Sequence, residues 1–536
     1  MSKTRNRWIG LVFISMAISL VIIDGTIVNT IFPSVIADLS LSSTEVQWVQ
    51  ESYVLVFAST LLVWGSLADK IGRRLLLLIG IAIFIAASVW AGNADSASTM
   101  ILARVVQGFG GAMVLPTTLS LVNANFQGKE RGIAFAVWGA TIGGMVAVGP
   151  VLGGWLATDF TWRWAFLVNL PFGVIILAGL IWFIGESKAE FQTKGIDWVG
   201  AGLSVVMFAT LVFGLIEGRI YGWITPEPNN QFQIGDFVWE NEQISIIPIS
   251  LAISLVFTVL FVLWEKARAK AGKSVLLDLK LFSIASFRNG SIAAMIISLG
   301  EFGLLFAIPL WLQNVLGLSP ISSGLVLLWL ALGAFMASGI GGALSGKLPA
   351  ARAVQIGVGL ELLGVAGVGF LANTELGWGA IAPFLFLYGI GIGLATAQLT
   401  GVIMVDVPMQ QIGQASGSQS TVRQVGSALG IAVLGTMLFT GTASAFDSKL
   451  EAYDLPAQQQ SVIVDAVVDS AGGAIPGLSQ GLQAQQVPAN IADEIQVLAG
   501  EAFTDGTKQA AVAAGIFLLL GFASTFRLGS KAKQTS

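Results

Sequence analysis

The 536-residue sequence contains no cysteine and no histidine. The absence of cysteine excludes disulfide bonds, thiolate catalysis and sulfur-ligated metals. Because histidine is the side chain that titrates most readily near neutral pH, any proton relay in this protein must use carboxylates. Charged residues make up only 11% of the chain, against about 25% in soluble proteins. The sequence therefore lacks the polar surface that a protein in water needs.

Basic charge is also scarce, because the net charge is −4. A chain without a polybasic patch has no electrostatic footprint for nucleic acid, so we expect no such partner. Hydrophobic residues make up 55% of the chain, and the mean hydropathy is +0.80. At the N-terminus, Lys3, Arg5 and Arg7 precede an apolar run from Trp8 to about Pro33. This run is longer than a signal-peptide core, so we interpret it as a retained first membrane helix.

The remaining apolar runs predict fourteen membrane crossings, each of which takes about 20 residues. The runs are continuous rather than alternating, which excludes a β-barrel and favours helices, whose backbone hydrogen bonds are satisfied internally. The runs begin near Trp8, Val46, Leu75, Ser98, Ile133, Trp162, Ile196, Ile244, Gly290, Ile321, Ala353, Trp378, Ala415 and Gln509.

The basic residues support this count and set the orientation. Most of the 27 lysine and arginine residues fall in alternate loops and at the two termini. Since cytoplasmic loops are enriched in lysine and arginine, both termini are predicted to be cytoplasmic, in a bacterial inner membrane. On the opposite side, residues 441–508 form a long predicted loop. Its amphipathic stretches, Gln458–Asp465 and Ile491–Leu498, predict two short helices, which could be a substrate lid or, as we favour, a surface cap.

Several charged residues fall inside the predicted spans. Buried ionisable groups are costly in lipid, so each is a candidate for function, although some form structural ion pairs. Asp24 lies in the first span, and Arg104 lies in the fourth with Gln107 one turn away on the same face. The remaining candidates are Glu51, Glu301 and Glu361.

Glycine is abundant, with 64 residues, and small residues let membrane helices approach closely. In the fifth span, Gly149, Gly153 and Gly154 surround Pro150, which removes a backbone donor and is expected to bend the helix. The sequence leaves open whether this cluster serves movement or ordinary packing.

Three segments resemble motifs of the major facilitator superfamily. Gly65–Arg74 resembles the loop signature between its second and third helices, and Leu102–Gly108 resembles its fourth-helix motif. Gly149–Gly154 resembles the fifth-helix motif associated with antiporters rather than symporters.

Further segments resemble one group within that superfamily, the drug:proton antiporters. Asp24–Asn29, followed by Pro33, is similar to their first-helix motif. Segments similar to the fourteen-helix branch of the group are Trp162–Phe166, Asn169–Gly173, Gly413–Gly417 and Arg423–Ala428. Together the matches cover nearly the whole chain, in order.

This resemblance implies an all-α membrane fold with two six-helix bundles, residues 1–190 and 285–536, and two inserted helices within 191–284. The binding site would lie near the membrane midplane between the bundles. The first helix of each bundle would line it, which places Asp24 and Glu301 in comparable positions. Glu361 would lie on a peripheral helix and therefore ranks lower.

The function that follows is proton-driven export of amphipathic, cationic drugs by a monomer without cofactor or metal. An exporter of one metabolite, peptide or lipid is the alternative. A channel would need rings of polar residues along a pore, and an enzyme would need a catalytic set; we find neither. The candidates for proton coupling are Asp24, Arg104 and Glu301, and those for substrate binding are Asp24, Glu51, Gln107, Trp138, Glu301 and Phe302. The candidates for conformational motifs are Gly65, Asp69, Gly72, Arg73, Gly149, Pro150, Gly153 and Gly154.

Asp24 carries the most specific hypothesis. Its neighbours Val21, Ile22 and Ile23 are apolar, and desolvation favours the neutral carboxylic acid. A nearby Arg104 or a cationic substrate favours the carboxylate instead. A group balanced between these influences can release its proton when cargo arrives. The structural alternative is a permanent pair between Asp24 and Arg104.

Overall fold

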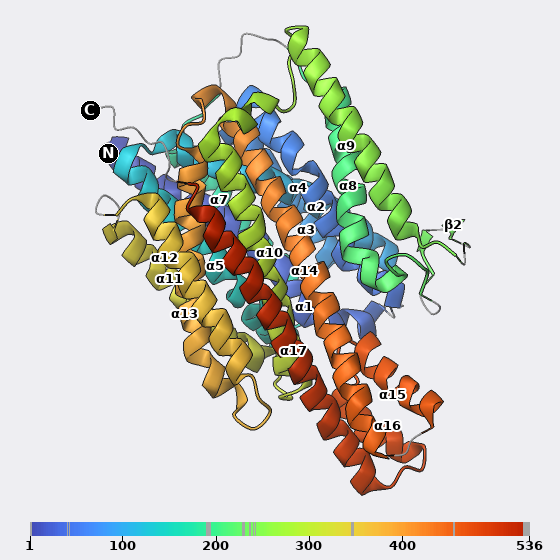
Figure 1. The fold of residues 1–536 in the computed structure, drawn as a ribbon. Coiled ribbons are helices and arrows are strands. Elements are labelled where there is room, and N and C mark those ends of the chain that lie inside the picture. Colours follow the sequence, from blue (N-terminus) through green and yellow to red (C-terminus); the bar gives the residue numbers. More distant parts are fainter. Residues whose placement is uncertain are drawn as a thin grey trace.

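A computed structural model describes residues 3–39, 41, 43–188, 195–227, 231–234, 237–239, 241, 243–344, 348–453 and 456–528. These residues are almost entirely helical (Figure 1). The sheet that they contain is one antiparallel ribbon of two strands, β1 (Gln233–Ile234) and β2 (Phe237–Val238), in which Ile234 pairs with Phe237. Long apolar helices satisfy their own backbone hydrogen bonds, which makes this architecture suitable for lipid.

The first group of helices comes from the N-terminal part of the chain. Its members are α1 (Lys3–Leu39), α2 (Ser43–Ile71), α3 (Arg73–Gly92), α4 (Ala97–Asn125), α5 (Gly128–Asp159), α6 (Trp164–Leu167) and α7 (Asn169–Phe183). Within the group, α4 packs against α2 and α3, while α1 packs against α5 and α7.

The second group comes from the C-terminal part. It contains α10 (Ala285–Asn314), α11 (Pro320–Leu344), α12 (Ala350–Leu371), α13 (Gly377–Met404), α14 (Ile412–Leu450) and α17 (Ala489–Thr525), with the short helices η1 (Leu279–Ser283) and η2 (Met409–Gln411). Here α13 packs against α11 and α12, and α10 packs against α14 and α17. The two groups meet where α5 packs against α11 and α2 packs against α14.

A helical hairpin connects the two groups. It consists of α8 (Trp198–Tyr221) and α9 (Ile246–Lys270), with the β-ribbon between them. The two helices pack on each other, and α8 also contacts α2 and α14. Figure 1 shows the hairpin, in green, along one side of the molecule.

Twelve helices of the described chain are long and apolar enough to cross a membrane. Two shorter apolar stretches, Val148–Ala157 and Ile321–Ala337, lie in α5 and α11. Large apolar side chains face outward, with Trp182 78% and Phe370 84% exposed, as expected for a surface in contact with lipid. The predicted all-helical membrane architecture is thus confirmed, and the count of fourteen crossings stays a prediction.

The predicted loop 441–508 is mostly helical. α14 continues to Leu450, and the first amphipathic pattern forms α15 (Ala457–Asp469), followed by α16 (Leu478–Ala484) and the single turns η3 (Glu451–Tyr453) and η4 (Ile475–Gly477). The separate short helix expected over Ile491–Leu498 was wrong, since this stretch is the beginning of α17. No proline follows Pro488, so the amphipathic turns continue directly into the apolar span.

Figure 1 places α15 and α16 beyond one end of the helical bundle, which we call the distal end. The beginning of α1 and the end of α17 lie at the opposite end, which we call the terminal end. The turn between α2 and α3, around Gly72, also lies at the terminal end, because Asp69 bonds to the first turn of α14 and α14 runs from there toward α15 at the distal end.

Candidate functional site

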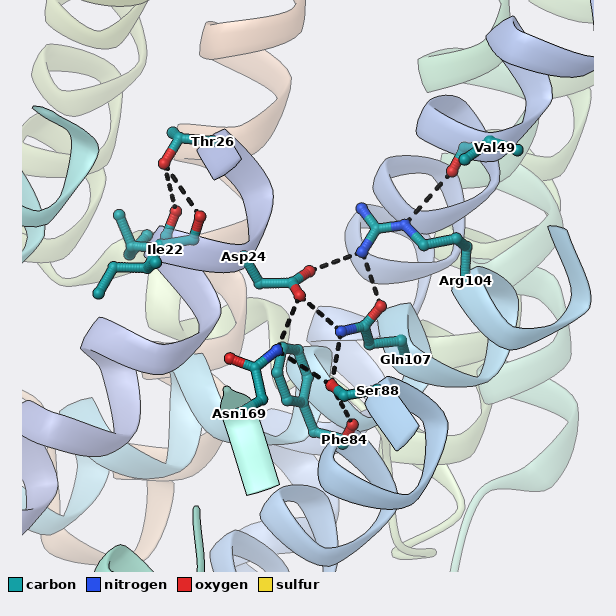
Figure 2. A network of polar contacts seen from close by, with 10 residues as sticks. Ile22, Asp24, Thr26, Val49, Phe84, Ser88, Arg104, Gln107 and Asn169 are labelled. Atoms are coloured by element: carbon teal, nitrogen blue, oxygen red, sulfur yellow. Dashed lines mark hydrogen bonds and ion pairs between the residues drawn. The ribbon is translucent and has the colours of Figure 1, made fainter. Parts of the chain in front are cut away.

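Asp24 is the centre of a buried polar network inside the first group of helices (Figure 2). Its Oδ2 receives a hydrogen bond from Arg104 Nη1 on α4 at 2.6 Å, which is also an ion pair. Its Oδ1 accepts from Gln107 Nε2 at 2.7 Å and from Asn169 Nδ2 at 3.0 Å. Ser88 on α3 receives further bonds from Gln107 and Asn169. Four helices, α1, α3, α4 and α7, thus meet at one carboxylate.

Arg104 is enclosed on its other sides as well. Its Nη1 also donates to Gln107 Oε1 at 2.6 Å, and its Nε donates to the carbonyl oxygen of Val49 on α2 at 3.3 Å. The guanidinium carbon lies 4.2 Å from the ring centroid of Tyr53, a cation–π distance. Because a buried charge is tolerated only when it is paired and hydrogen-bonded, the network has the features of a complete buried ion pair.

This arrangement brings together three of the predicted residues, Asp24, Arg104 and Gln107. Each is buried in the interior of the first group. Gln107, a substrate-binding candidate, bonds to protein groups through both its oxygen and its nitrogen. In this conformation the geometry is that of the structural alternative, and whether Asp24 releases a proton during transport stays a prediction.

Glu301 lies in a second and less complete polar cluster, in the other group of helices. Its Oε2 is 3.6 Å from Arg423 Nη2 on α14, a longer contact than that of Asp24. Its Oε1 is buried and has no hydrogen-bond partner among the described residues. Tyr388 on α13 donates its hydroxyl to the backbone oxygen of Glu301 at 3.0 Å, and not to the carboxylate.

Glu361, which ranks low in the sequence analysis because its helix is expected to be peripheral, lies near the same cluster, and its role stays a prediction. The carboxyl group of this α12 residue is fully buried and lies within electrostatic range of both Glu301 and Arg423. A peripheral position in the bundle does not determine which face of a helix a residue occupies. Glu361 occupies the inner face, where α12 packs against α13.

Among the described residues, the other predicted substrate-binding residues share no hydrogen bond or ion pair with these clusters. Glu51 on α2 lies within electrostatic range of Tyr221 at the end of α8. It therefore lies by the inserted hairpin. Trp138 on α5 is buried and donates to Thr118 on α4 at 3.2 Å. Phe302 on α10 is half-buried.

A third arrangement joins α2 to α14 at the terminal end, and we call it the α2–α14 contact. Asp69 is buried and accepts a hydrogen bond from the backbone N–H of Gln414, in the first turn of α14, at 3.1 Å. An anionic side chain at this position stabilises the N-terminus of a helix. Arg73 bonds to Asp69 Oδ1 at 2.7 Å and to the backbone oxygen of Met409 at 3.1 Å. The expected contact is present, and its role in transport stays a prediction.

Two glycines allow close approaches at the terminal end of α2, Gly65 toward α14 and Gly72 in the turn to α3. A β-carbon at Gly65 would lie 2.5 Å from the Cα of Gly417 and 2.6 Å from the oxygen of Gly413, so the two backbones touch. Gly72 has a φ of 130°, which only glycine adopts easily. A β-carbon there would also meet the carboxyl group of Glu186, which accepts the N–H groups of Arg74 and Leu75 at the start of α3.

The glycines around Pro150 fit α5 against two other helices. β-carbons at Gly149 and Gly153 would collide with Thr26, Ile27 and Thr30 on α1, and one at Gly154 would collide with Ile321 on α11. Since α1 and α5 belong to one group and α11 to the other, the motif lies where the two groups meet. The helix continues through Pro150 without interruption.

We expect Asp69→Asn to leave the protein abundant but to reduce transport severalfold. The substitution removes the anion from the α14 N-terminus and leaves the buried Arg73 without its carboxylate. A reporter cysteine at the buried Ser416 on α14, in this naturally cysteine-free chain, should then react faster with an impermeant maleimide applied to the terminal end. Asp465→Asn, on the exposed face of α15, is the control. Unchanged labelling and transport would contradict a latch.

We expect Pro150→Ala to affect cycling more than folding. Alanine restores a backbone donor inside α5 and should keep or raise the thermal stability. Exchange across liposome membranes should slow severalfold, or proton leak should rise, as measured with an internal pH-sensitive dye. Pro383→Ala tests a helix-interior proline in α13, away from this motif. If both variants behave like the parent, the motif serves packing alone.

Sequence reasoning missed Ser88, Asn169 and Tyr388 as parts of the two clusters. A signal existed for Ser88, which is an isolated polar residue among the apolar residues that follow the start of α3. Asn169 was noted only as part of a motif. Neither residue reveals its partner from sequence, because each bond crosses between helices that are far apart along the chain.

Comparison with known proteins agrees with this architecture. The family model of the Major Facilitator Superfamily matches residues 14–431. The chain belongs to this superfamily. Its members are transporters, and this membership agrees with the prediction of a transporter instead of an enzyme. The human organic anion transporter MFSD10 has a similar fold, with a TM-score of 0.60 at 12% identity, covering 97% of this chain and 99% of that one.

Curated relatives in the superfamily are named for resistance and export. The chain is 28% identical over 524 residues to the tetracenomycin C resistance and export protein of Streptomyces glaucescens, covering 96% of this chain and 92% of that one. It is 32% identical over 448 residues to the puromycin resistance protein of Streptomyces alboniger, covering 82% and 83%. It is also 29% identical over 479 residues to the multidrug resistance protein Stp of Mycobacterium tuberculosis, covering 88% and 84%.

Proposed function

We propose that this member of the major facilitator superfamily exports amphipathic, cationic drugs in exchange for protons by alternating access. It acts as a monomer in the inner membrane of a bacterium and needs no cofactor. The observation that carries the coupling is a pair of buried carboxylate–arginine contacts, Asp24 with Arg104 and Glu301 with Arg423. They lie on membrane helices of the two groups, where a permanent charge without a function is costly.

Fourteen crossings fit this proposal. The twelve long apolar helices and the two shorter stretches in α5 and α11 are together fourteen, and α5 and α11 are 32 and 25 residues long. An even number of crossings places both chain ends on the same side. The basic residues that flank the terminal end, including Lys70, Arg73 and Arg74, favour the cytoplasm for that side. The bundles then correspond to residues 1–190 and 285–536, and the α8–α9 hairpin to the insert.

The α2–α14 contact supports an alternating-access mechanism. It closes the terminal end by two features that separate without unfolding either group: a glycine-to-glycine backbone approach and a carboxylate at a helix N-terminus. The names of the relatives, which include resistance to puromycin and multidrug resistance, support drugs as the cargo. Membrane-buried carboxylates favour cations among them.

The test is transport by the purified protein in liposomes with an imposed pH gradient. We expect a fluorescent lipophilic cation to be concentrated against its gradient, and a protonophore to abolish that accumulation. Protein-free liposomes control for passive partitioning of the cation. If a panel of lipophilic cations is not moved while a single metabolite, peptide or lipid is, the protein is the dedicated exporter instead. If nothing responds to the pH gradient, proton exchange is wrong.

A further inference from the structure

The central turns of five helices of the second group contain three charged residues, and two of them are acids. By sequence, the spans of α10, α11, α12, α13 and α14 carry only Glu301, Glu361 and Arg423 away from their ends. Glu301 and Glu361 are both buried, while Arg423 is 21% exposed. Arg423 contacts Glu301 and lies within electrostatic range of Glu361, so one guanidinium serves two carboxyl groups.

The carboxyl group of Glu361 makes fewer hydrogen bonds and ion pairs in the described structure than those of Asp24, Asp69 and Glu301. Neither of its carboxyl oxygens has a hydrogen-bond partner among the described residues. The reason is the surface that α13 offers. A β-carbon at Gly391 would lie 2.6 Å from the Cγ of Glu361, so the side chain of Glu361 lies against bare backbone. The nearest polar side chain of α13, that of Tyr388, donates to the backbone of Glu301 instead.

Charge balance decides what this geometry allows. If both acids were ionised, the cluster would hold two negative charges and one positive charge without compensating donors. Such a buried group takes up a proton instead of remaining charged. Other charged groups face the cluster only from a distance: on α17, Lys508 pairs with Asp505 at the exposed edge of the α12–α17 packing. No further cation in the described part of these helices neutralises Glu361.

We propose that Glu361 is a proton-carrying residue and that it forms, with Glu301, a two-carboxyl proton site in the C-terminal half. Arg423 compensates one carboxylate, and a proton bound to a carboxyl oxygen compensates the other. Each proton enters from water onto a carboxylate oxygen and returns to water from it, so no other reactant is needed. This inference rests on the proposed proton exchange and names a second place where the exchange occurs, apart from Asp24.

The two acids of this site make fewer polar contacts than Asp24, so fewer bonds must break when a proton binds or leaves. Asp24 accepts three hydrogen bonds from protein donors at 3.0 Å or less. Glu301 has one arginine contact at 3.6 Å and one oxygen without a hydrogen-bond partner among the described residues, and both oxygens of Glu361 lack such a partner. A small movement of Arg423 would change the charge balance of both acids at once. Asp24, in contrast, would have to lose several bonds.

The experiment is infrared difference spectroscopy of the purified full-length protein in liposomes, titrated upward from about pH 6, above the range in which exposed carboxyl groups titrate. A protonated carboxylic acid has a carbonyl stretching band that carboxylates lack and that shifts in D2O. We expect such a band in the parent protein, and we expect it to disappear as the pH rises. Glu361→Gln should remove part of this band, and Glu301→Gln should shift the pH at which the remainder disappears. Glu375→Gln, on the exposed loop before α13, should leave the band unchanged.

The same liposomes allow transport to be measured in parallel. Glu361→Gln should slow uphill, gradient-driven accumulation at least tenfold while downhill exchange continues. A spectrum unchanged by Glu361→Gln, a Glu361 band that persists at every pH, or normal uphill transport by this variant would each overturn the inference. Failure of the proposed function has a different signature, because the parent protein would then show the titrating band but no gradient-driven transport.

Discussion

Asp24→Asn should abolish export driven by a pH gradient and should also lower the stability of the protein. The amide removes the negative charge that Arg104 contacts at 2.6 Å in a buried site. Both carboxylate oxygens of Asp24 accept hydrogen bonds, Oδ1 from Gln107 and Asn169 and Oδ2 from Arg104. In either orientation, the NH2 group of the new amide therefore faces a donor and loses a bond. Removing one partner of a buried ion pair costs about 3–5 kcal/mol. Thermal unfolding in detergent should therefore show a clear decrease in Tm.

A second substitution separates the two roles of Asp24. In the double variant Asp24→Asn with Arg104→Gln, the buried arginine charge is also gone, so most of the lost stability should return. Gradient-driven export should remain absent if Asp24 exchanges protons. If export returns together with stability, Asp24 is a structural partner of Arg104 and does not carry a proton.

The conservative variant and the second carboxylate complete the test. Asp24→Glu keeps the charge and should retain some export with a shifted pH profile. We would abandon proton exchange at Asp24 if Asp24→Asn still concentrated substrate while Glu301→Gln did not. That outcome would leave the C-terminal cluster of Glu301 and Arg423 as the place of exchange.

The Asp24 network shows how far sequence reasoning reaches. Polar residues in apolar spans are conspicuous, and the spacing of Arg104 and Gln107 places them on one helix face. The pairing of Asp24 with them could therefore be anticipated, and the structure contains it. The contributions of Ser88 and Asn169 could not, because they depend on how α3 packs against α4 and α7 and on how α7 packs against α1.

The surroundings of two candidate residues could not be predicted, and for the same reason. The position of Glu361 in the order of helices indicated a peripheral helix, but its burial depends on the face that packs against α13. Glu51 was a substrate-binding candidate, yet its neighbour Tyr221 belongs to the inserted hairpin, whose docking place the sequence does not specify. Helix number and approximate bounds follow from hydropathy, whereas the orientation of a helix about its own axis follows from packing.

Gly65→Val should prevent the terminal end from closing and should thereby stop transport. The clash involves backbone atoms, because a β-carbon at Gly65 would lie 2.5 Å from the Cα of Gly417 and 2.6 Å from the oxygen of Gly413. No side-chain rotation relieves such a contact, so α2 and α14 must move apart. That separation also breaks the hydrogen bond between Asp69 and the N-terminus of α14. If it costs about 2 kcal/mol, as overpacking commonly does, the closed population falls roughly 30-fold.

The variant should nevertheless fold, because α2 and α14 belong to different groups and the clash lies between the groups. We therefore expect normal abundance and a Tm close to that of the parent, together with rapid maleimide labelling of a cysteine at Ser416. Gly144→Ala is the matched control, since a β-carbon at that position on α5 would have no atom within 4 Å. Unfolding of Gly65→Val would show that the α2–α14 contact stabilises the whole protein. Normal transport with slow labelling would show that the two helices do not need this close approach to alternate.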